Sequence, residues 1–240
     1  MTSKLETLRR TPAYPFVEAA HYLQLPIATL RAWCVGYDYR GGTKRFKPVI
    51  RLDGKRRDGL SFLNLVEAHV LSAIRRQHRI PLPKIRQALD YVAKHLELDR
   101  PLSQARFATL GVNLFVEELD RVVNASREGQ MEMADLIRTH LNRIERDAHG
   151  MPIKLYPFTT RPNAATDIEQ SSVESARTVV IDPRIAFGRP VLVGTSVPTA
   201  VLADRFKAGD TLSEMAEDYG AQTEAIEEAI RCEFDRRQAA

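Results

Sequence analysis

Apolar residues near the N-terminus recur at the spacing of two short helices. The positions that follow one helix face are Phe16, Ala19, Ala20 and Leu23, and then Ile27, Leu30 and Trp33. Pro26 lies between the two sets and suits the start of the second helix, because its missing N–H would have no partner there. Two short helices joined by a tight turn predict a helix-turn-helix over residues 12–36.

The next segment, residues 37–62, predicts a hairpin attached to this helix pair. Gly41-Gly42 is typical of a tight turn, residues 47–52 are strand-like, and Asp53-Gly54 indicates a second turn. A hairpin in this place is the wing of a winged helix-turn-helix. Helical periodicity then returns from residue 62 to about 77 and from residue 83 to about 98.

The middle of the chain mixes extended and helical patterns. Residues 101–119 predict strands around a turn at Gly111, and residues 153–158 predict another extended segment. Residues 131–147 predict an amphipathic helix ended by Gly150, which is either a core helix or a dimer interface. Residues 159–175 are polar and show no period, which predicts a linker.

The last part of the chain predicts a hairpin followed by three helices. Apolar runs at 179–181 and 191–193 flank Gly188, which permits a positive φ, and helical segments follow at 199–207, 211–219 and 222–237. Thr211 with Glu214 three residues later predicts a capping box. We expect a small core of Val191, Val193 and Val197 over Leu202, Phe206, Met215 and Ile226.

These patterns predict a mainly α fold with small β hairpins. The expected parts are a winged helix-turn-helix at 1–100, an α/β connecting segment at 101–158, a linker at 159–176, and a C-terminal β-hairpin and helical module, shaped like a helix-turn-helix, at 177–240. No run approaches the ~20 apolar residues of a membrane span, and the first residues lack the apolar core of a secretory signal. A cytoplasmic location without a membrane partner is therefore expected.

Charge is unevenly distributed along the chain. Residues 1–110 hold 20 Lys and Arg against 9 Asp and Glu, whereas residues 111–240 hold 15 against 22. The basic half favours a polyanion as its partner. Its predicted hairpin, residues 38–58, carries eight cations against three carboxylates and directly follows the second helix.

A helix in the major groove with a basic hairpin on the flanking backbone is a common way to hold double-stranded DNA, and a solvated basic surface is the alternative. Thr29 and Arg31 on the helix are the candidates for reading bases. The candidate DNA-binding residues on the hairpin, which would contact phosphates, are Arg40, Lys44, Arg45, Lys47 and Arg51.

The glycines of the C-terminal hairpin do not fit a phosphate loop. Gly188 and Gly194 are six residues apart rather than five, and Thr195-Ser196 stands where a Lys would follow. No His lies between Met151 and Ala240 to serve as a base, and Cys34 and Cys232 have no neighbour at metal-ligand spacing. A nucleotide-handling enzyme is a third hypothesis that rests only on these glycines. We expect no catalytic activity, no metal and no cofactor.

The first hundred residues resemble MerR-type winged-helix regulators. The stretches that carry the resemblance are FVEAAHYLQLPIATLRAW, the basic wing, and LVEAHVLSAIRRQHRIPLPKIRQALDYV. The likeness implies a DNA-binding domain that works as a homodimer.

A second resemblance covers residues 181–233, which are similar to the small bacterial domain of unknown function numbered 433. The matching positions are Asp182-Pro183, Gly188-Arg189-Pro190, Gly194-Thr195, Val197-Pro198, Ala208-Gly209, Thr211, Glu214 and Asp218-Tyr219. Ser196 departs from the pattern, since many members have Arg there. From the matched positions we take as candidate partner-binding residues Arg189, Val197, Glu214, Asp218 and Tyr219.

The combination of these two parts resembles VapB-type antitoxins. That resemblance implies a non-enzymatic antitoxin that represses its own operon through the winged helix and neutralises a toxin with a PIN-like ribonuclease fold. Residues 200–240 hold five basic against ten acidic residues, so this end suits a basic protein or a dimer contact better than DNA. The alternative is a one-component MerR-like regulator whose C-terminal module senses a small molecule or dimerises.

Overall fold

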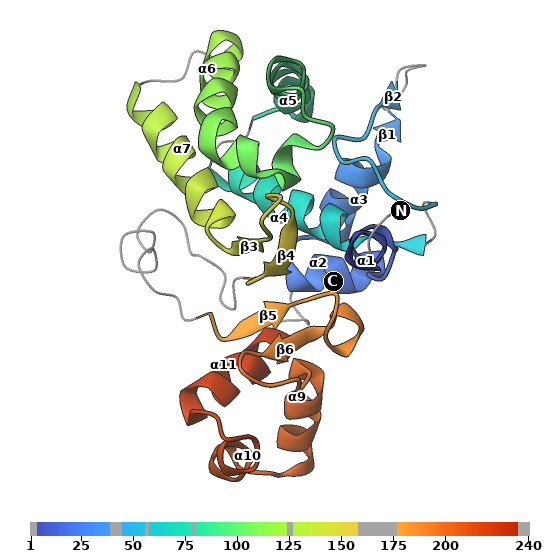
Figure 1. Cartoon of the computed structure of the whole chain (residues 1–240), viewed down its shortest axis with the longest axis vertical. Helices are drawn as coiled ribbons and strands as arrows, with labels where there is room; N and C mark the ends of the chain where they lie inside the picture. Colours follow the sequence, from blue (N-terminus) through green and yellow to red (C-terminus); the bar gives the residue numbers. More distant parts are fainter. Residues whose placement is uncertain are drawn as a thin grey trace.

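A computed structural model of the chain describes residues 4–38, 45–55, 58–77, 80–123, 127–157 and 177–234. The fold is mainly α with small antiparallel sheets, as the sequence predicts (Figure 1). The helices are α1 (Lys4–Arg10), α2 (Phe16–Tyr22), α3 (Ile27–Val35), α4 (Phe62–Gln77), α5 (Leu82–Leu96), α6 (Val112–Val123), α7 (Arg127–Leu141), α9 (Thr199–Ala208), α10 (Leu212–Tyr219) and α11 (Thr223–Phe234). The strands are β1 (Tyr37–Asp38), β2 (Arg45–Phe46), β3 (Ile144–Arg146), β4 (Pro152–Leu155), β5 (Val179–Ile181) and β6 (Pro190–Leu192).

The predicted helix pair is confirmed as α2 and α3. Leu30, Trp33 and Cys34 turn the inner face of α3 into the core, where all three are buried. Between the helices the chain turns at Gln24, whose φ is 51°, and Pro26 precedes α3 as its N-cap. The apolar spacing that predicts the pair therefore also decides which face of α3 stays outside.

The wing differs in part from its prediction. β1 and β2 pair antiparallel, Tyr37 opposite Phe46, while the predicted turn at Gly41-Gly42 lies outside the described residues. The strand expected at 47–52 is wrong, because this segment bends back onto α3. The N–H groups of Val49 and Ile50 both donate to the Trp33 carbonyl, at 2.8 and 3.0 Å. This contact buries Ile50 and leaves the hairpin short.

The strands expected at 101–119 are also wrong, because this region is helical. It contains the 3₁₀ turn η2 (Pro101–Ser103), the π-helical turn η3 (Phe107–Gly111) and α6. Gly111 is needed for packing and not for a turn: a Cβ there would lie 2.7 Å from the Phe107 ring. The apolar residues of α6 share one buried face, which packs against α5 and α7.

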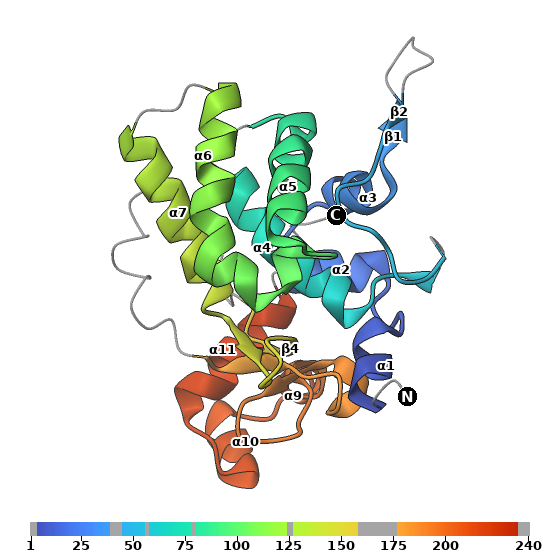
Figure 2. The same cartoon turned by 45° about the horizontal axis from the view of Figure 1, so that its top comes forward.

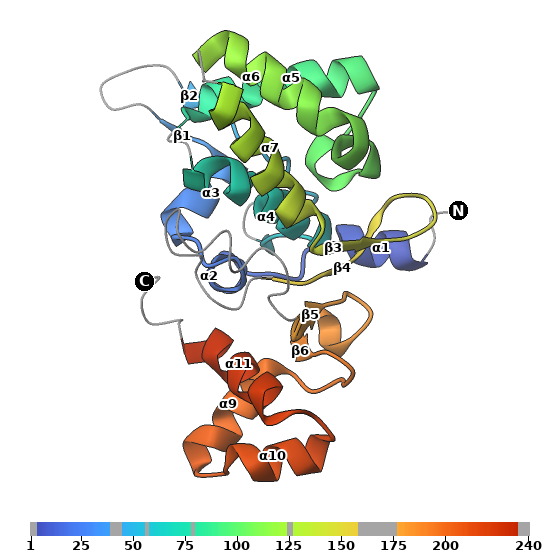
Figure 3. The same ribbon diagram turned by 90° about the vertical axis from the view of Figure 1, so that its left-hand side faces the viewer.

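A four-stranded antiparallel sheet joins the two ends of the chain (Figure 3). α7 ends at Leu141, earlier than the predicted helix, because Ile144–Arg146 forms β3 and pairs with β4. β4 then pairs with β5, Leu155 opposite Ile181, although the expected linker between them lies outside the described residues. Leu155 and Ile181 both belong to the main core, which also contains Trp33.

The C-terminal hairpin, the three helices and the capping box at Thr211 are confirmed. Their small core is formed by Val179, Leu192, Leu202, Met215, Ile226, Ala229 and Ile230. Val193 and Phe206, which we expected inside it, are exposed by 41% and 42%. Leu192 fills the place instead, because successive side chains of a strand point to opposite faces.

The structure also bears on membrane spanning. Among the residues it describes, no helix combines the length and the apolar character needed to cross a bilayer.

Candidate nucleic-acid interface

α3 carries the residues predicted to read bases. Ala28 and Arg31 are exposed, and Thr29 is half-buried. Thr29 and Arg31 flank Leu30, which with Trp33 anchors the inner side of α3 in the core, so the two candidates lie on either side of the buried face. A short helix fixed in this way presents its polar side chains as a rigid unit.

The base of the wing is held by an arginine that the sequence analysis did not single out. The rings of Tyr37 and Phe46 stack with centroids 5.0 Å apart, and the Arg86 guanidinium from α5 lies 5.4 Å from the Phe46 ring. Arg86 also donates to the carbonyl oxygens of Lys47 and Pro48. The Lys47 side chain is exposed. Of the other candidates, Arg45 lies in β2, and Arg40 and Lys44 lie outside the described residues.

Arg51 has a partner within the chain. Its guanidinium donates to both carboxylate oxygens of Asp99, at 3.0 and 2.9 Å, and both side chains are exposed. Both contacts come from the Nη2 atom, and because the pair is exposed it is weak and leaves Arg51 able to exchange Asp99 for a phosphate. No local pattern indicates this pair, since its members are 48 residues apart.

Behind this loop lies a buried ion cluster. Arg100 donates to Asp53 at 2.7 Å and to Glu67 at 3.0 Å, and the side chains of all three are almost completely buried. Arg100 and Asn64 also donate to the Arg51 carbonyl, at 3.0 and 2.8 Å. Burial raises the pKa of Glu67 to about 7, although Arg100 opposes the shift. The cluster ties the loop after the wing to α4.

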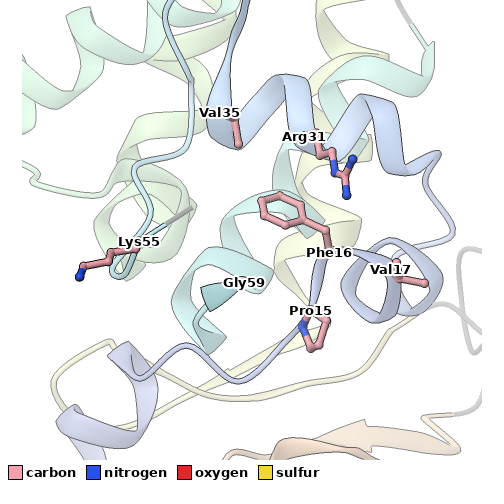
Figure 4. A pocket seen from close by; sticks show the side chains of 7 residues that line it. All are labelled: Pro15, Phe16, Val17, Arg31, Val35, Lys55 and Gly59. Atoms are coloured by element: carbon pink, nitrogen blue, oxygen red, sulfur yellow. The ribbon is translucent and has the colours of Figure 1, made fainter. Parts of the chain in front are cut away.

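An open pocket of about 740 Å³ lies between α3, the start of α2 and the loop after the wing (Figure 4). It is lined by Pro15, Phe16, Val17, Arg31, Val35, Lys55 and Gly59. The Arg31 guanidinium lies over the Phe16 ring, 5.9 Å from its centroid. Arg31 and Lys55 lie on opposite sides of this pocket, and the Lys55 amine points away from Phe16 (Figure 4). A cation beside an aromatic ring, as in Arg31 over Phe16, can take a sugar-phosphate of a nucleic-acid backbone.

The five candidate partner-binding residues lie on three parts of the C-terminal region: Arg189 before β6, Val197 after it, and Glu214, Asp218 and Tyr219 on α10. Glu214 accepts from the Thr211 N–H in the capping box, and Val197 packs against the small C-terminal core. Asp218 pairs with Arg205 at 2.7 Å, and the Arg205 guanidinium lies 5.3 Å from the Tyr219 ring. Arg189 is exposed and forms no ion pair within the described part of the chain.

No group of three or more His, Cys, Asp or Glu residues is placed to hold a metal ion in the part of the chain that the structure describes. Burial raises the pKa of the Cys34 thiol well above its ordinary value. Cys34 lies in the core and packs there as a small apolar residue.

Comparison with known families divides the chain into two matched regions. Residues 12–89 match the family described as "Putative DNA-binding HTH domain", and residues 179–231 match the "Protein of unknown function (DUF433)" family. The first region contains α2, α3, the wing and α4. The chain therefore carries a helix-turn-helix of a DNA-binding type, followed by a domain of the 433 type.

Two curated proteins of Mycobacterium tuberculosis (strain ATCC 25618 / H37Rv) are similar along most of the chain. "Putative antitoxin VapB45" is 27% identical over 245 residues, with 95% of this chain and 96% of that protein covered. "Uncharacterized protein Rv2308" is 25% identical over 217 residues, covering 90% and 88%. The crystal structure of Rv2018 from Mycobacterium tuberculosis shares the fold, with a TM-score of 0.63, 24% identity, and coverage of 92% and 97%.

Proposed function

We propose that the chain binds duplex DNA through α3 and the wing. The observation that carries the proposal is the exposed Arg31 and half-exposed Thr29 on α3, which lie within the matched helix-turn-helix region together with the exposed Lys47 of the wing. α3 enters the major groove, where Thr29 contacts base edges. Lys47 and the pocket cations Arg31 and Lys55 meet the flanking phosphates.

The similarity to an antitoxin-named protein supports a second activity of the same chain. The chain, in this proposal, is an antitoxin of a bacterial type II pair that represses its own operon as a MerR-like homodimer. It neutralises a PIN-like ribonuclease toxin by direct protein contact. The C-terminal region of the 433 type supplies that contact.

The DNA half is tested by fluorescence anisotropy with a labelled duplex from the region upstream of the gene. Lys47→Ala should weaken binding by about threefold to tenfold at low salt, since one phosphate contact and its counterion release are lost. Arg121→Ala on α6 is the matched control, because its side chain is exposed and α6 lies on the far side of α5 from α3 (Figure 2). Equal affinities of wild type, Lys47→Ala and Arg121→Ala for this duplex would contradict the proposed interface.

The partner half is tested by co-expression with the product of the adjacent open reading frame, followed by co-purification. A stable complex that abolishes the ribonuclease activity of that product supports the antitoxin. DNA binding without any such complex supports the one-component regulator instead.

A further inference from the structure

The loop between β5 and β6 holds a phenyl ring almost entirely in solvent. Phe187, in the turn η4 (Ala186–Gly188), is 94% exposed, the largest exposure among the large apolar residues that the structure describes. Figures 2 and 3 show this orange loop beside α1, away from α10. An exposed Phe forgoes the stabilisation that burial would give it and contributes nothing to the core below it.

The backbone of the same loop is strained. Ala186 and Phe187 have φ values of 47° and 57°, and Gly188 follows at 78°. The left-handed conformation is unfavourable for residues with a Cβ, so two in succession need support from their surroundings. Strain that is maintained together with an exposed aromatic ring points to a functional role rather than a stabilising one.

The surroundings hold this loop in place. Asp182 is completely buried and accepts from the Arg184 backbone N–H and guanidinium, at 2.6–2.9 Å. The Gly188 N–H donates to the Ile185 carbonyl at 2.8 Å. Gly188 also lies against the buried Tyr14, and a Cβ there would overlap the Tyr14 hydroxyl. The ring is therefore presented by a preorganised loop, which lowers the entropy lost on binding.

The charges next to Phe187 indicate which kind of partner surface the ring suits. Arg189 is exposed and has no ion pair among the described residues, and the paired Arg184 side chain is 45% exposed. A twofold axis passing through this loop would place the two Arg189 guanidinium groups near each other, and their repulsion disfavours that contact between two copies of the chain. A phenyl anchor beside an uncompensated guanidinium suits a protein pocket with an apolar floor and carboxylates at its rim.

We propose that Phe187 and Arg189 form the anchor by which this chain grips a partner protein with such a pocket. This inference rests on the proposed antitoxin function and gives it a contact site. It assigns the contact to the β5–β6 loop, which is basic, and not to the acidic helices from which the sequence analysis expected a basic partner. The partner surface that it predicts is therefore acidic and apolar.

Calorimetric titration against the purified product of the adjacent open reading frame tests the anchor. Phe187→Ala should weaken binding by about 30-fold or more, the loss typical of a central aromatic anchor, and Arg189→Glu by a similar factor. Phe206→Ala removes a phenyl ring that is 42% exposed on α9, and it should change affinity by less than about twofold. Wild-type affinity in Phe187→Ala overturns the anchor and leaves the proposed function standing.

Three further outcomes separate the alternatives. Failure of the wild-type chain to bind the product overturns the toxin partner and the anchor together. A loss of DNA affinity in Phe187→Ala, or a change of its oligomeric state in sedimentation, assigns the ring to DNA or to a second copy and overturns the anchor. Phe187→Gly should raise Tm by about 2–4 °C, since glycine relieves the strain, and a lower Tm would mean that the ring serves stability.

Discussion

Gly188 shows how a single missing side chain lets two distant segments meet. The residue lies in the C-terminal hairpin with φ at 78°, and its α-carbon faces the hydroxyl of Tyr14, which precedes α2. That hydroxyl is buried and has no hydrogen-bond partner among the residues that the structure describes. Any Cβ at this position therefore meets both backbone strain and a filled space.

We expect Gly188→Ala to lower the free energy of unfolding by about 2–4 kcal/mol, measured by urea titration. Gly194→Ala is the matched control, because Gly194 also has a positive φ of 81° but has nothing within 4 Å of a Cβ. It should lose only about 1–2 kcal/mol. Adding Tyr14→Phe to Gly188→Ala should recover part of the difference, and equal losses at the two glycines would refute the steric argument.

Arg31 allows a test of whether a cation on α3 reads bases or holds the backbone. Its position over Phe16, facing the pocket with Lys55, favours the backbone. Arg31→Ala should then weaken binding to specific and unrelated duplexes alike and reduce the slope of log affinity against log salt by about 1. Lys55→Ala should behave in the same way. A loss confined to the specific duplex would return Arg31 to the base-reading role that the sequence suggested.

At the scale of elements, the buried Arg100 cluster connects the loop after the wing to α4 and η2. Asp53 comes from the loop, Glu67 from α4, and Arg100 lies directly before η2. A buried charge without its partners is strongly destabilising, by about 3–5 kcal/mol. Arg100→Ala should therefore lower the free energy of unfolding by about that amount, whereas Arg51→Ala, which breaks only an exposed pair, should lower it by at most about 1 kcal/mol. Similar losses in the two variants, measured by urea titration, would rule out this role for Arg100.

Glu67 gives the cluster a pH dependence. Because its pKa in the folded chain, about 7, lies above the ordinary value of 4.5, the folded state binds more protons between those two values. The contribution of Glu67 to the free energy of unfolding therefore falls as the pH rises from about 4.5 to 7. Glu67→Gln should flatten the profile of unfolding free energy across pH 5–8, and an unchanged slope would exclude Glu67 as its source.

The elements that bury one apolar face against a core could be predicted from the spacing of their apolar residues. Both pairs of N-terminal helices, the C-terminal hairpin and the capping box at Thr211 follow from local patterns. The wrong predictions concern segments whose conformation is decided by contacts with residues distant in the sequence. Residues 47–52 bend because their N–H groups find the Trp33 carbonyl, and Gly111 permits helix packing instead of ending a strand. Of the interface, the sequence indicated α3 but neither the Arg51–Asp99 pair nor the exposed Phe187.

For the whole molecule, the sheet makes the C-terminal region part of the main core. Ile181 of β5 is fully buried in the same cluster as Trp33 of α3, the single tryptophan of the chain. Ile181→Ala should lower the free energy of unfolding by about 2–4 kcal/mol. Trp33 fluorescence and far-ultraviolet circular dichroism should report the same shift. A shift in circular dichroism alone would mean that the two ends unfold independently.

The end of α11 lies against the helix-turn-helix. The His21 Nε2 atom of α2 is 3.6 Å from a Glu233 carboxylate oxygen, and Thr199 of α9 donates to the other oxygen at 2.6 Å. A ligand that distinguishes between states with this junction closed and open must also distinguish between states of α2. By thermodynamic reciprocity, whatever factor DNA imposes on the affinity for that ligand, the ligand imposes on the affinity for DNA. In the proposed function, the two binding activities would then form one energetic cycle, and occupancy of the operator would report on the supply of the partner.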